Sequence, residues 1–462
     1  MKRGPKANLS GTMRPCHAAH SVVDAIVTFQ ENLMLNPHNR RQFLSNAAVT
    51  TAAAGVSLSA LRTRADSSPN HRVVVGVMGL NRGQYLVSGF AKQPNVEVKY
   101  VCDVDSTRIG PVAKQLETET GKAPQGLGDF RRILDDKEVD VLVCAAPNHW
   151  HAPATILACA AGKHAYVEKP CSHNPREGEL MVAAARKHNR AVQVGSQRRS
   201  AEGWIEAIER LHQGVIGRVF LARSWFAKAR GSIGTGVPAA VPPHIDYELW
   251  QGPAPRRPYL SNILHYNWHW RWHWGNGELG NNGVHGLDLC RWGMDVDYPI
   301  RVTSSGGRYY WQDDQETPDT HTVCFEFPGN RQITWAGLSG TRHGGRFIEF
   351  YGDSGTMEVD SSGSYVLFDK GDKKVEERKT SPLNDAPHFA NLLAAIRNDT
   401  PLELNTEIEK AHKSALLCHL GNIAHRTGRT LNCNDANGHI RDDEDAMKLW
   451  GREYQPGWEP NV

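Results

Sequence analysis

The sequence predicts a doubly wound parallel α/β sheet, followed by an α+β region with an open, mostly antiparallel sheet. From residue 71 to about residue 195, short apolar runs alternate with helical stretches, which is typical of parallel strands joined by right-handed crossover helices. After about residue 196, strand-like runs follow one another with turns between them, which indicates antiparallel pairing. The chain has 462 residues, of which 40% are hydrophobic and 22% charged, and this composition excludes collagen-like, disordered and multi-span membrane classes.

The elements follow in order along the chain. In the parallel region we expect strands at 73–78, 96–102, 139–145, 165–167 and 191–194, and helices that include 111–120 and 178–187. In the second region we expect strands at 218–227, 302–311, 320–327, 332–338 and 347–359, and helices at 282–292, 388–398 and 406–426.

The first 65 residues differ from the rest in charge. They carry a net charge of +6, which leaves −3 for the remainder of a chain whose total is +3. Arg40 and Arg41 precede an uncharged stretch, 42–61, that is rich in Ala, Ser and Thr, and this resembles a twin-arginine export signal with cleavage near Ala65. A membrane anchor or an exposed basic tail are alternatives, but the stretch has few Leu, Ile or Phe residues and would insert poorly into a membrane. Translation could also begin at Met34. We therefore expect an exported, periplasmic or secreted bacterial protein with no stable membrane insertion, and an acidic body that does not bind nucleic acid.

The nine cysteines are scattered and form no Cys-x-x-Cys pair. Several lie inside apolar strand-like runs, which favours buried thiols over disulfides or a zinc framework. We expect no metal site, because the 22 histidines include no His-Glu-x-x-His pattern. A serine hydrolase is also unexpected, because no Gly-x-Ser-x-Gly elbow follows a strand.

A glycine turn and a carboxylate favour a dinucleotide. Gly79, Asn81, Arg82 and Gly83 follow the first strand, where backbone N–H groups at a helix N-terminus can approach a pyrophosphate. Because Asn81 replaces the second glycine of the usual pattern, the turn alone equally fits an ordinary tight turn. Asp103 ends the second strand, where its carboxylate can accept hydrogen bonds from both ribose hydroxyls; the alternative is a helix cap. The carboxylate favours NAD over NADP, although Arg108 leaves some room for NADP.

Several further segments carry a family resemblance. Residues 140–151 (DVLVCAAPNHWH), 162–170 (GKHAYVEKP), 194–199 (VGSQRR), 280–288 (GNNGVHGLD) and the helix at 389–397 resemble the Gfo/Idh/MocA family of oxidoreductases over about residues 71–436. The resemblance implies an N-terminal Rossmann domain that binds NAD. It places Lys169 beside the nicotinamide and the substrate hydroxyl as the leading proton-handling residue, and it matches Asn281 and His285 to the family's Asp-x-x-x-His pair. The further residues that it suggests for the cofactor are Pro147, His151, Glu168, Lys169 and Gln197, and for the substrate Arg198.

The chemistry of these residues agrees with that implication. Hydride removal from a secondary alcohol requires the hydroxyl proton to leave, and a partly desolvated Lys169 near a cationic ring would favour its neutral, basic form. Asn281, His285 and Asp288 fall at i, i+4 and i+7, so that one helix face should present all three, Asp288 to the substrate. Asn281 cannot ionise and therefore cannot polarise His285 as a carboxylate would. The alternatives are a core histidine for His285 and a surface lysine for Lys169.

Residues 266–274 alternate aromatic and polar side chains. In an extended chain the tryptophans would face one way, and Trp270 and Trp272 could stack on a sugar. Burial of the tryptophans against the sheet is an equally good interpretation.

We therefore expect a signal region at 1–65, a NAD-binding Rossmann domain at 71–195, a substrate and oligomerisation domain at 196–436 and a C-terminal tail at 437–462. The predicted function is NAD-dependent hydride transfer on a secondary alcohol of a sugar, polyol or glycoside, in a homo-oligomer. One alternative is a redox-neutral glycoside lyase or hydrolase that uses tightly bound NAD through a keto-sugar. Another is a non-catalytic sugar-binding protein.

Overall fold

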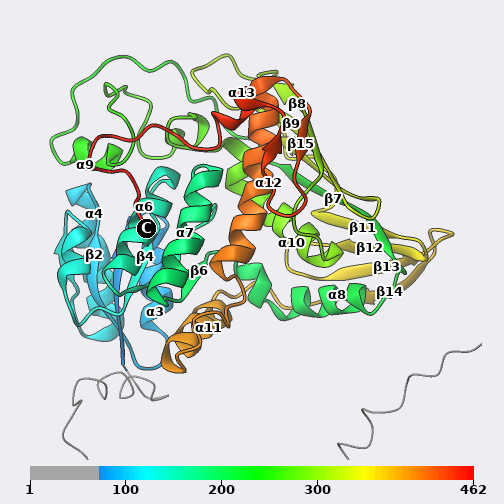
Figure 1. The fold of residues 1–462 in the computed structure, drawn as a ribbon. Helices are drawn as coiled ribbons and strands as arrows, with labels where there is room; N and C mark the ends of the chain where they lie inside the picture. The colour runs from blue at the N-terminus through cyan, green and yellow to red at the C-terminus, as the bar shows by residue number, and fades with distance from the viewer. Residues whose placement is uncertain (1–71) are drawn as a thin grey trace, which may run out of the picture. The chain divides into compact units, whose positions relative to one another are not determined.

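The computed structural model describes residues 72–462. The expected export signal and Cys16 lie outside the described residues. In the described part, two sheets form the framework (Figure 1). No helix within 72–462 is both long and apolar enough to cross a membrane.

The first sheet is parallel throughout. Its strands are β1 (Val73–Met78), β2 (Val96–Cys102), β3 (Gln125–Leu127), β4 (Val141–Cys144), β5 (His164–Val167) and β6 (Val192–Val194). They run in the order β3-β2-β1-β4-β5-β6, which is the Rossmann order and confirms the predicted fold class. The sequence analysis missed β3, because this three-residue strand at the sheet edge has no apolar run.

Helices cover both faces of this sheet. They are α3 (Gly83–Ala91), α4 (Ser106–Thr120), α5 (Arg131–Asp135), α6 (Asn148–Ala160) and α7 (Pro175–His188). One face is buried against α6 and α7, which lie side by side in Figure 1, and the other against α3, α4 and the late helix α11 (Ala386–Arg397). Phe389 holds α11 against the first sheet, because its ring centroid lies 4.6 Å from that of Phe90 in α3.

The second sheet has ten strands. These are β7 (Val219–Ala227), β8 (Arg301–Gly307), β9 (Thr320–Phe327), β10 (Arg331–Leu338), β11 (Ile348–Gly352), β12 (Gly355–Val359), β13 (Tyr365–Asp369), β14 (Lys374–Arg378), β15 (Leu431–Cys433) and β16 (Ile440–Arg441). The pairs are antiparallel except for β7 and β10, in agreement with the predicted mostly antiparallel sheet. Buried and partly exposed residues alternate along β9 and β10, so one face of the sheet packs on the core and the other does not.

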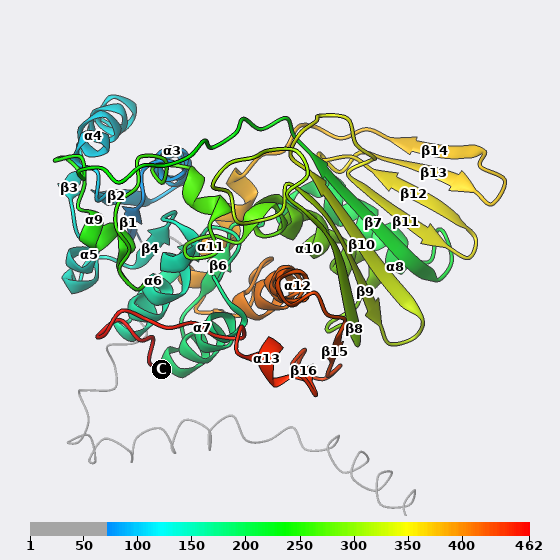
Figure 2. The ribbon, with the colours of Figure 1, turned by 90° about the horizontal axis from the view of Figure 1, so that it is seen from above.

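The remaining helices are α8 (Glu202–His212), α9 (Tyr247–Gln251), α10 (Val284–Met294), α12 (Ile408–Thr427) and α13 (Glu444–Met447). α10 and α12 pack on the same side of the second sheet and share its core (Figure 2). α12 also contacts α7, so it joins the two sheets.

The C-terminal 26 residues are not the separate tail that the sequence suggested. β16 extends the second sheet, and the chain after α13 returns to the first region (Figure 1). There Trp458 packs edge-on against Trp150, with ring centroids 5.0 Å apart. The C-terminal run has few apolar residues, so its sequence gave no signal that it packs on the first region. Two tryptophans and a few backbone hydrogen bonds hold it there.

The eight described cysteines are unpaired thiols, and seven of them are buried. This confirms the prediction of buried thiols for the described residues. Burial raises the pKa of the Cys144 thiol to about 12, so it stays protonated and packs as a small apolar side chain.

Candidate active site

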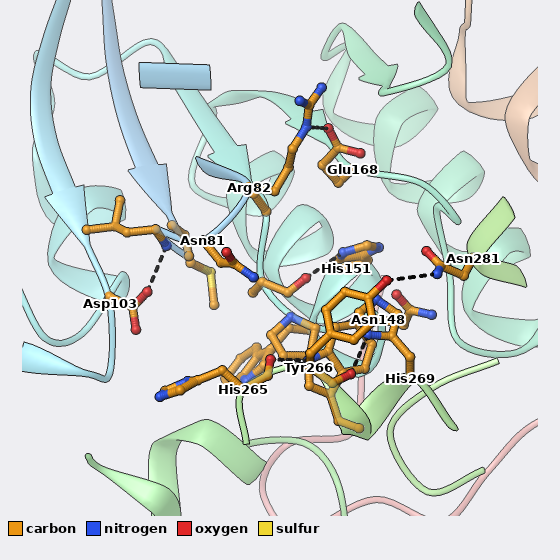
Figure 3. A pocket seen from close by; sticks show the side chains of 18 of the residues that line it. Asn81, Arg82, Asp103, Asn148, His151, Glu168, His265, Tyr266, His269 and Asn281 are labelled. Carbon is orange, nitrogen blue, oxygen red and sulfur yellow. Dashed lines mark hydrogen bonds and ion pairs between the residues drawn. The ribbon is translucent and has the colours of Figure 1, made fainter. Parts of the chain in front are cut away.

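A cavity of about 450 Å³ opens where the parallel strands end. The turn after β1, Asp103 after β2, Pro147 after β4 and Lys169 after β5 form one wall, because the carboxyl ends of parallel strands meet at one edge of a sheet. Residues between 226 and 285 form the other wall (Figure 3). The volume lies in the range typical of small-molecule sites.

The turn after β1 requires glycine at its first position. Gly79 has φ +85°, and a Cβ there would lie 2.7 Å from the backbone of Ala145. α3 begins at Gly83 without a side-chain cap or an acidic residue in its first turn, so its N–H groups and positive dipole end are available to an anion. Gly83 itself does not line the cavity; a Cβ there would stand 3.2 Å from Val77 Cγ1, so its role is close packing of helix on strand.

Asp103 is fixed at the far end of the same wall. Its Oδ2 accepts a hydrogen bond from the Leu80 backbone N–H at 2.7 Å (Figure 3). Its Oδ1 accepts one from the Asp105 backbone N–H at 2.9 Å. Burial raises the pKa of Asp103, while these two N–H groups oppose the rise. Each carboxylate oxygen keeps a lone pair for a further donor. The uncapped helix, the obligatory glycine and this carboxylate together fit the pyrophosphate and ribose of a dinucleotide.

Lys169 lies at the other end of the cavity. Its Nζ donates to the Asn281 carbonyl at 2.6 Å and to Asn281 Oδ1 at 3.2 Å. Burial lowers the pKa of Lys169, and the neighbouring Glu168 carboxylate only partly opposes this. Glu168 is held by Arg82, whose Nε lies 3.1 Å from Oε1 (Figure 3). The neutral amine is therefore more accessible than in a lysine in water.

His285 faces the cavity from α10. Burial, followed by repulsion from Arg198 and Lys169, lowers its pKa well below the usual value, so the ring is neutral near pH 7. A π-helical turn, Leu279–Gly283, precedes α10 and places Asn281 beside Lys169. Asn281 and His285 thus line the cavity together, as predicted.

Asp288 does not face the cavity, and its prediction as a substrate residue is wrong. Its carboxylate is 2% exposed and forms a bidentate ion pair with Arg199, with Nε to Oδ2 at 2.9 Å and Nη2 to Oδ1 at 2.9 Å. Ser414 of α12 donates a third hydrogen bond at 2.6 Å. The helix turns Asp288 toward α12 and the segment after β6, so this residue joins elements of the fold.

The aromatic run is also different from the extended chain that the sequence suggested. Asn267–Trp270 forms a 3₁₀ turn, and Trp268, Trp270 and Trp274 are all buried. Trp270 packs under Arg230, whose guanidinium lies 4.7 Å from the ring centroid, and it does not line the cavity. The compact turn is favoured over an extended chain because it buries the large rings, and each buried ring removes a large apolar area from water.

Trp272 and Arg198 also lie outside the cavity lining. Trp272 carries Arg426 over its ring at 5.3 Å and lines a second pocket. Arg198 donates to the Ser361 carbonyl at 3.2 Å and stacks on Phe347 at 5.0 Å. The predicted role of Trp272 as a direct substrate ligand is therefore wrong for this arrangement. The charge of Arg198 acts on His285 and Lys169, so its predicted substrate role stays a prediction.

The other predicted cofactor residues line the cavity: Gly79, Asn81, Arg82, Asp103, Pro147, His151, Glu168, Lys169 and Gln197. His151 is buried, with Nδ1 2.6 Å from the Pro170 carbonyl and Nε2 2.8 Å from the Ala146 carbonyl. Burial lowers the pKa of His151, so its neutral ring donates a hydrogen bond to only one of these two carbonyls, and the ring shapes the wall between the ends of β4 and β5. Within residues 72–462, no group of three or more His, Cys, Asp or Glu side chains is arranged to hold a metal ion.

The sequence analysis missed a polar network on the second wall. Arg230 pairs with the buried Glu278, with Nη2 3.0 Å from Oε1, and Arg230 Nη1 donates to the Tyr266 hydroxyl at 3.3 Å. That hydroxyl accepts from Asn281 Nδ2 at 3.4 Å (Figure 3). Tyr266 stood in the aromatic run, but Arg230 and Glu278 had no local signal because the sequence separates them by 48 residues. Asn148, which also lines the cavity, directly follows Pro147 and could have been found there.

Comparison with family models agrees with this arrangement. Residues 71–196 match a model described as the oxidoreductase family, NAD-binding Rossmann fold. Residues 224–459 match the oxidoreductase family, C-terminal alpha/beta domain. Both carry the designation Gfo/Idh/MocA.

Curated relatives match only in part. A glycosyl hydrolase family 109 protein 1 from Shewanella sp. (strain MR-4) is 26% identical over 207 residues, 40% of this chain and 45% of the relative. An inositol 2-dehydrogenase from Salmonella typhimurium is 29% identical over 150 residues, 32% of this chain and 42% of the relative. The chain thus spans less than half the length of these relatives.

Solved structures share the fold. An aldose-aldose oxidoreductase from Caulobacter crescentus, complexed with glycerol, aligns with a TM-score of 0.61 at 19% identity, covering 78% of this chain and 100% of that one. A levoglucosan dehydrogenase in complex with NADH and levoglucosan aligns with a TM-score of 0.61 at 17% identity, covering 78% and 99%.

Proposed function

Because the chain belongs to the Gfo/Idh/MocA oxidoreductase family, we propose that it is an NAD-dependent enzyme acting on a secondary alcohol of a sugar, polyol or glycoside. One observation carries this proposal: Lys169 lies at one end of the cavity and Asp103 at the other, and burial lowers the pKa of the Lys169 amine. The dehydrogenase names among the relatives and similar structures support a sugar-like substrate.

The chain's own residues divide the binding work. The first turn of α3 and the glycine turn would hold the pyrophosphate, and Asp103 would accept the ribose hydroxyls. The same carboxylate would repel a 2′-phosphate, which favours NAD over NADP. When bound, NAD supplies the acceptor for a hydride leaving the alcohol carbon.

Lys169 would handle the proton. As the neutral amine it can accept the hydroxyl proton while the hydride leaves, so that the alcohol becomes a ketone without a charged oxygen in a desolvated site. His285 is neutral and can hydrogen-bond the same or the neighbouring hydroxyl. Asn281 holds the Lys169 amine through two oxygens and so fixes the direction of its lone pair.

A redox-neutral reaction on a glycoside is the second candidate. It is favoured by the relatives named glycosyl hydrolase family 109, which share 26% identity with this chain. Here a sugar carbon would be oxidised transiently, so that the neighbouring C–H becomes acidic and loses its proton as the glycosidic oxygen leaves. In a hydrolase water then adds to the resulting double bond, in a lyase it does not, and in both the keto carbon is finally reduced again. Export through the signal expected at residues 1–65 would favour this candidate, because a permanently bound cofactor needs no external supply.

One experiment separates the candidates. Purified protein is incubated with a panel of polyols, sugars and glycosides while NADH absorbance and products are followed, the latter by mass spectrometry. Stoichiometric NADH with a keto product indicates a dehydrogenase, whereas glycoside cleavage without net NADH indicates the redox-neutral reaction. Bound NAD with no turnover on any compound would contradict both and would indicate a sugar-binding protein.

A further inference from the structure

A second pocket, of about 400 Å³, lies on the other side of the aromatic run from the active-site cavity. It is formed by the start of α7, the end of α12, the segment 255–276 and the chain after α13. Tyr266, Trp268 and His269 face the first cavity, whereas Trp272, His273 and Asn276 face the second. The two share no lining residue.

The second pocket is strongly cationic. Glu453 is the single acidic residue among those that line it. The cationic residues lining it are Arg256, Arg257, Arg426, Lys448 and Arg452. Two of these are neutralised locally, since Arg256 pairs with Glu248, and Lys448 with Asp445 at 2.7 Å.

The other three guanidinium groups form no hydrogen-bonded ion pair with a carboxylate within residues 72–462. Arg426 rests on the Trp272 ring, and Glu316 is the carboxylate whose charge acts on it. Arg452 bonds neutral atoms, with Nε 3.2 Å from the Glu453 carbonyl and Nη1 3.2 Å from His173 Nδ1. Arg257 forms a loose ion pair with Glu316 at 3.9 Å. Glu316 and Glu177 offset part of the positive charge, and a bound anion would reduce the remaining repulsion among the three groups.

The surrounding groups show the same positive field. Burial, with added repulsion from Arg257 and Arg452, lowers the pKa of His273 to about 4. Burial lowers the pKa of Arg452; Glu177 and Tyr454 oppose this, and Arg257 adds to it. The amide groups in the lining are engaged within the protein: Asn174 Oδ1 accepts the Glu177 backbone N–H at 3.0 Å, and Asn422 Nδ2 donates to the Asn276 carbonyl at 2.9 Å. The guanidinium groups are therefore the main donors that the pocket offers.

We propose that this second pocket binds an oxyanion, a carboxylate or sulfate group that is either free or carried by a sugar. Guanidinium groups recognise both through paired N–H donors, and three of them can share one anion. The pocket is roomier than a lone anion needs, so an anion carried by a sugar also fits. The proposal is independent of the proposed function, because it rests on residues outside the active-site cavity.

The test uses the full chain, saturated with NADH so that anions cannot occupy the glycine turn. Calorimetry measures binding of glucuronate, inorganic sulfate and neutral glucose to the wild type and to the Arg257→Gln/Arg426→Gln double variant. Arg257 is half exposed and Arg426 is also exposed, so the fold should tolerate their loss, which thermal unfolding verifies. Arg342→Gln is the matched control, because Arg342 is exposed and does not line the pocket.

We expect the wild type and Arg342→Gln to bind glucuronate equally and the double variant to bind it at least about tenfold more weakly, as expected for lost charge-assisted hydrogen bonds. Affinity should fall with added NaCl, and glucose should not compete. Tighter binding of glucuronate than of sulfate supports a sugar-borne anion, and equal binding supports a free anion in the same site. Absence of binding, or equal binding by the wild type and the double variant, would overturn the proposal.

Discussion

Asp103 provides the most local test of cofactor binding. Replacing it with Ala removes the acceptor expected for two ribose hydroxyls, so NAD affinity should fall ten- to hundredfold, since each charge-assisted hydrogen bond contributes about 1.5–3 kcal/mol and part is regained from water. Calorimetry with NAD and NADP measures the change. Asp103→Asn, which keeps the shape and loses the charge, is the control. It should lose less NAD affinity than the Ala variant, and its affinities for NAD and NADP should differ less than those of the wild type. Unchanged NAD affinity in the Ala variant would remove Asp103 from the site.

Asn281 contacts the Lys169 amine directly, so a change of charge at Asn281 tests whether Lys169 titrates in the reaction. In Asn281→Asp a carboxylate would replace an amide oxygen 3.2 Å from Lys169 Nζ, which stabilises the ammonium and raises the pKa of Lys169. The pH at which alcohol oxidation reaches half its maximal rate should therefore move upward. Asn281→Ala adds no charge and should not move it upward. An unchanged midpoint in the Asp variant would show that Lys169 is not the group that titrates.

Some of the individual residues of the candidate site could be predicted from the sequence. Residues in the motifs after β1, β2, β4 and β5 could be assigned because strand ends in a parallel sheet meet at one edge. Arg230, Glu278 and Tyr266 could not be, because tertiary packing alone brings these residues together. Asp288 was misassigned because residues seven positions apart share a face only in a regular α-helix. Asn281 lies in the π-helical turn before α10, so Asp288 does not share its face.

Among the elements, α10 depends on one buried ion pair. Asp288→Ala would leave Arg199 charged, unpaired and buried, which should lower the free energy of unfolding by about 3–5 kcal/mol. Urea unfolding measures this loss. The double variant Arg199→Met/Asp288→Leu removes both charges and should recover much of the stability. NAD affinity of the folded protein should stay unchanged. A fully stable Asp288→Ala protein that had lost only substrate affinity would contradict the structural role.

The strands show where sequence patterns fail. The run at 347–359 was predicted as one strand, yet it forms two, because Gly352-Asp353-Ser354-Gly355 interrupts it and the chain reverses there. The Asp353 carboxylate accepts the Arg218 backbone N–H at 3.1 Å. β14 was missed because it is largely exposed at the sheet edge and charged, so it lacks the apolar alternation of a half-buried strand. The first deviation therefore had a local turn signal, whereas β14 depends on its pairing with β13.

For the whole molecule, buried neutral histidines predict acid sensitivity. Burial lowers the pKa of His419 and His321 to about 3 and that of His412 to about 4. Between these values and the unfolded value near 6.5, the unfolded chain binds more protons, so stability is lost as pH falls through that window. Each such histidine should contribute a slope of about 1.4 kcal/mol per pH unit. Urea unfolding from pH 7 to 4 checks this, and His419→Gln should flatten the slope. Constant stability over that range would refute it.

The two sheets frame one cavity, in which we propose that Lys169 handles the proton of a hydride transfer. This role is tested by comparing wild type and Lys169→Ala for bound NAD and for turnover of the compound on which the wild type is most active. We predict NAD affinity within a few-fold and turnover lowered at least about a hundredfold, as expected for loss of a general base. Wild-type turnover in the Lys169→Ala protein, with NAD still bound, would contradict the claim.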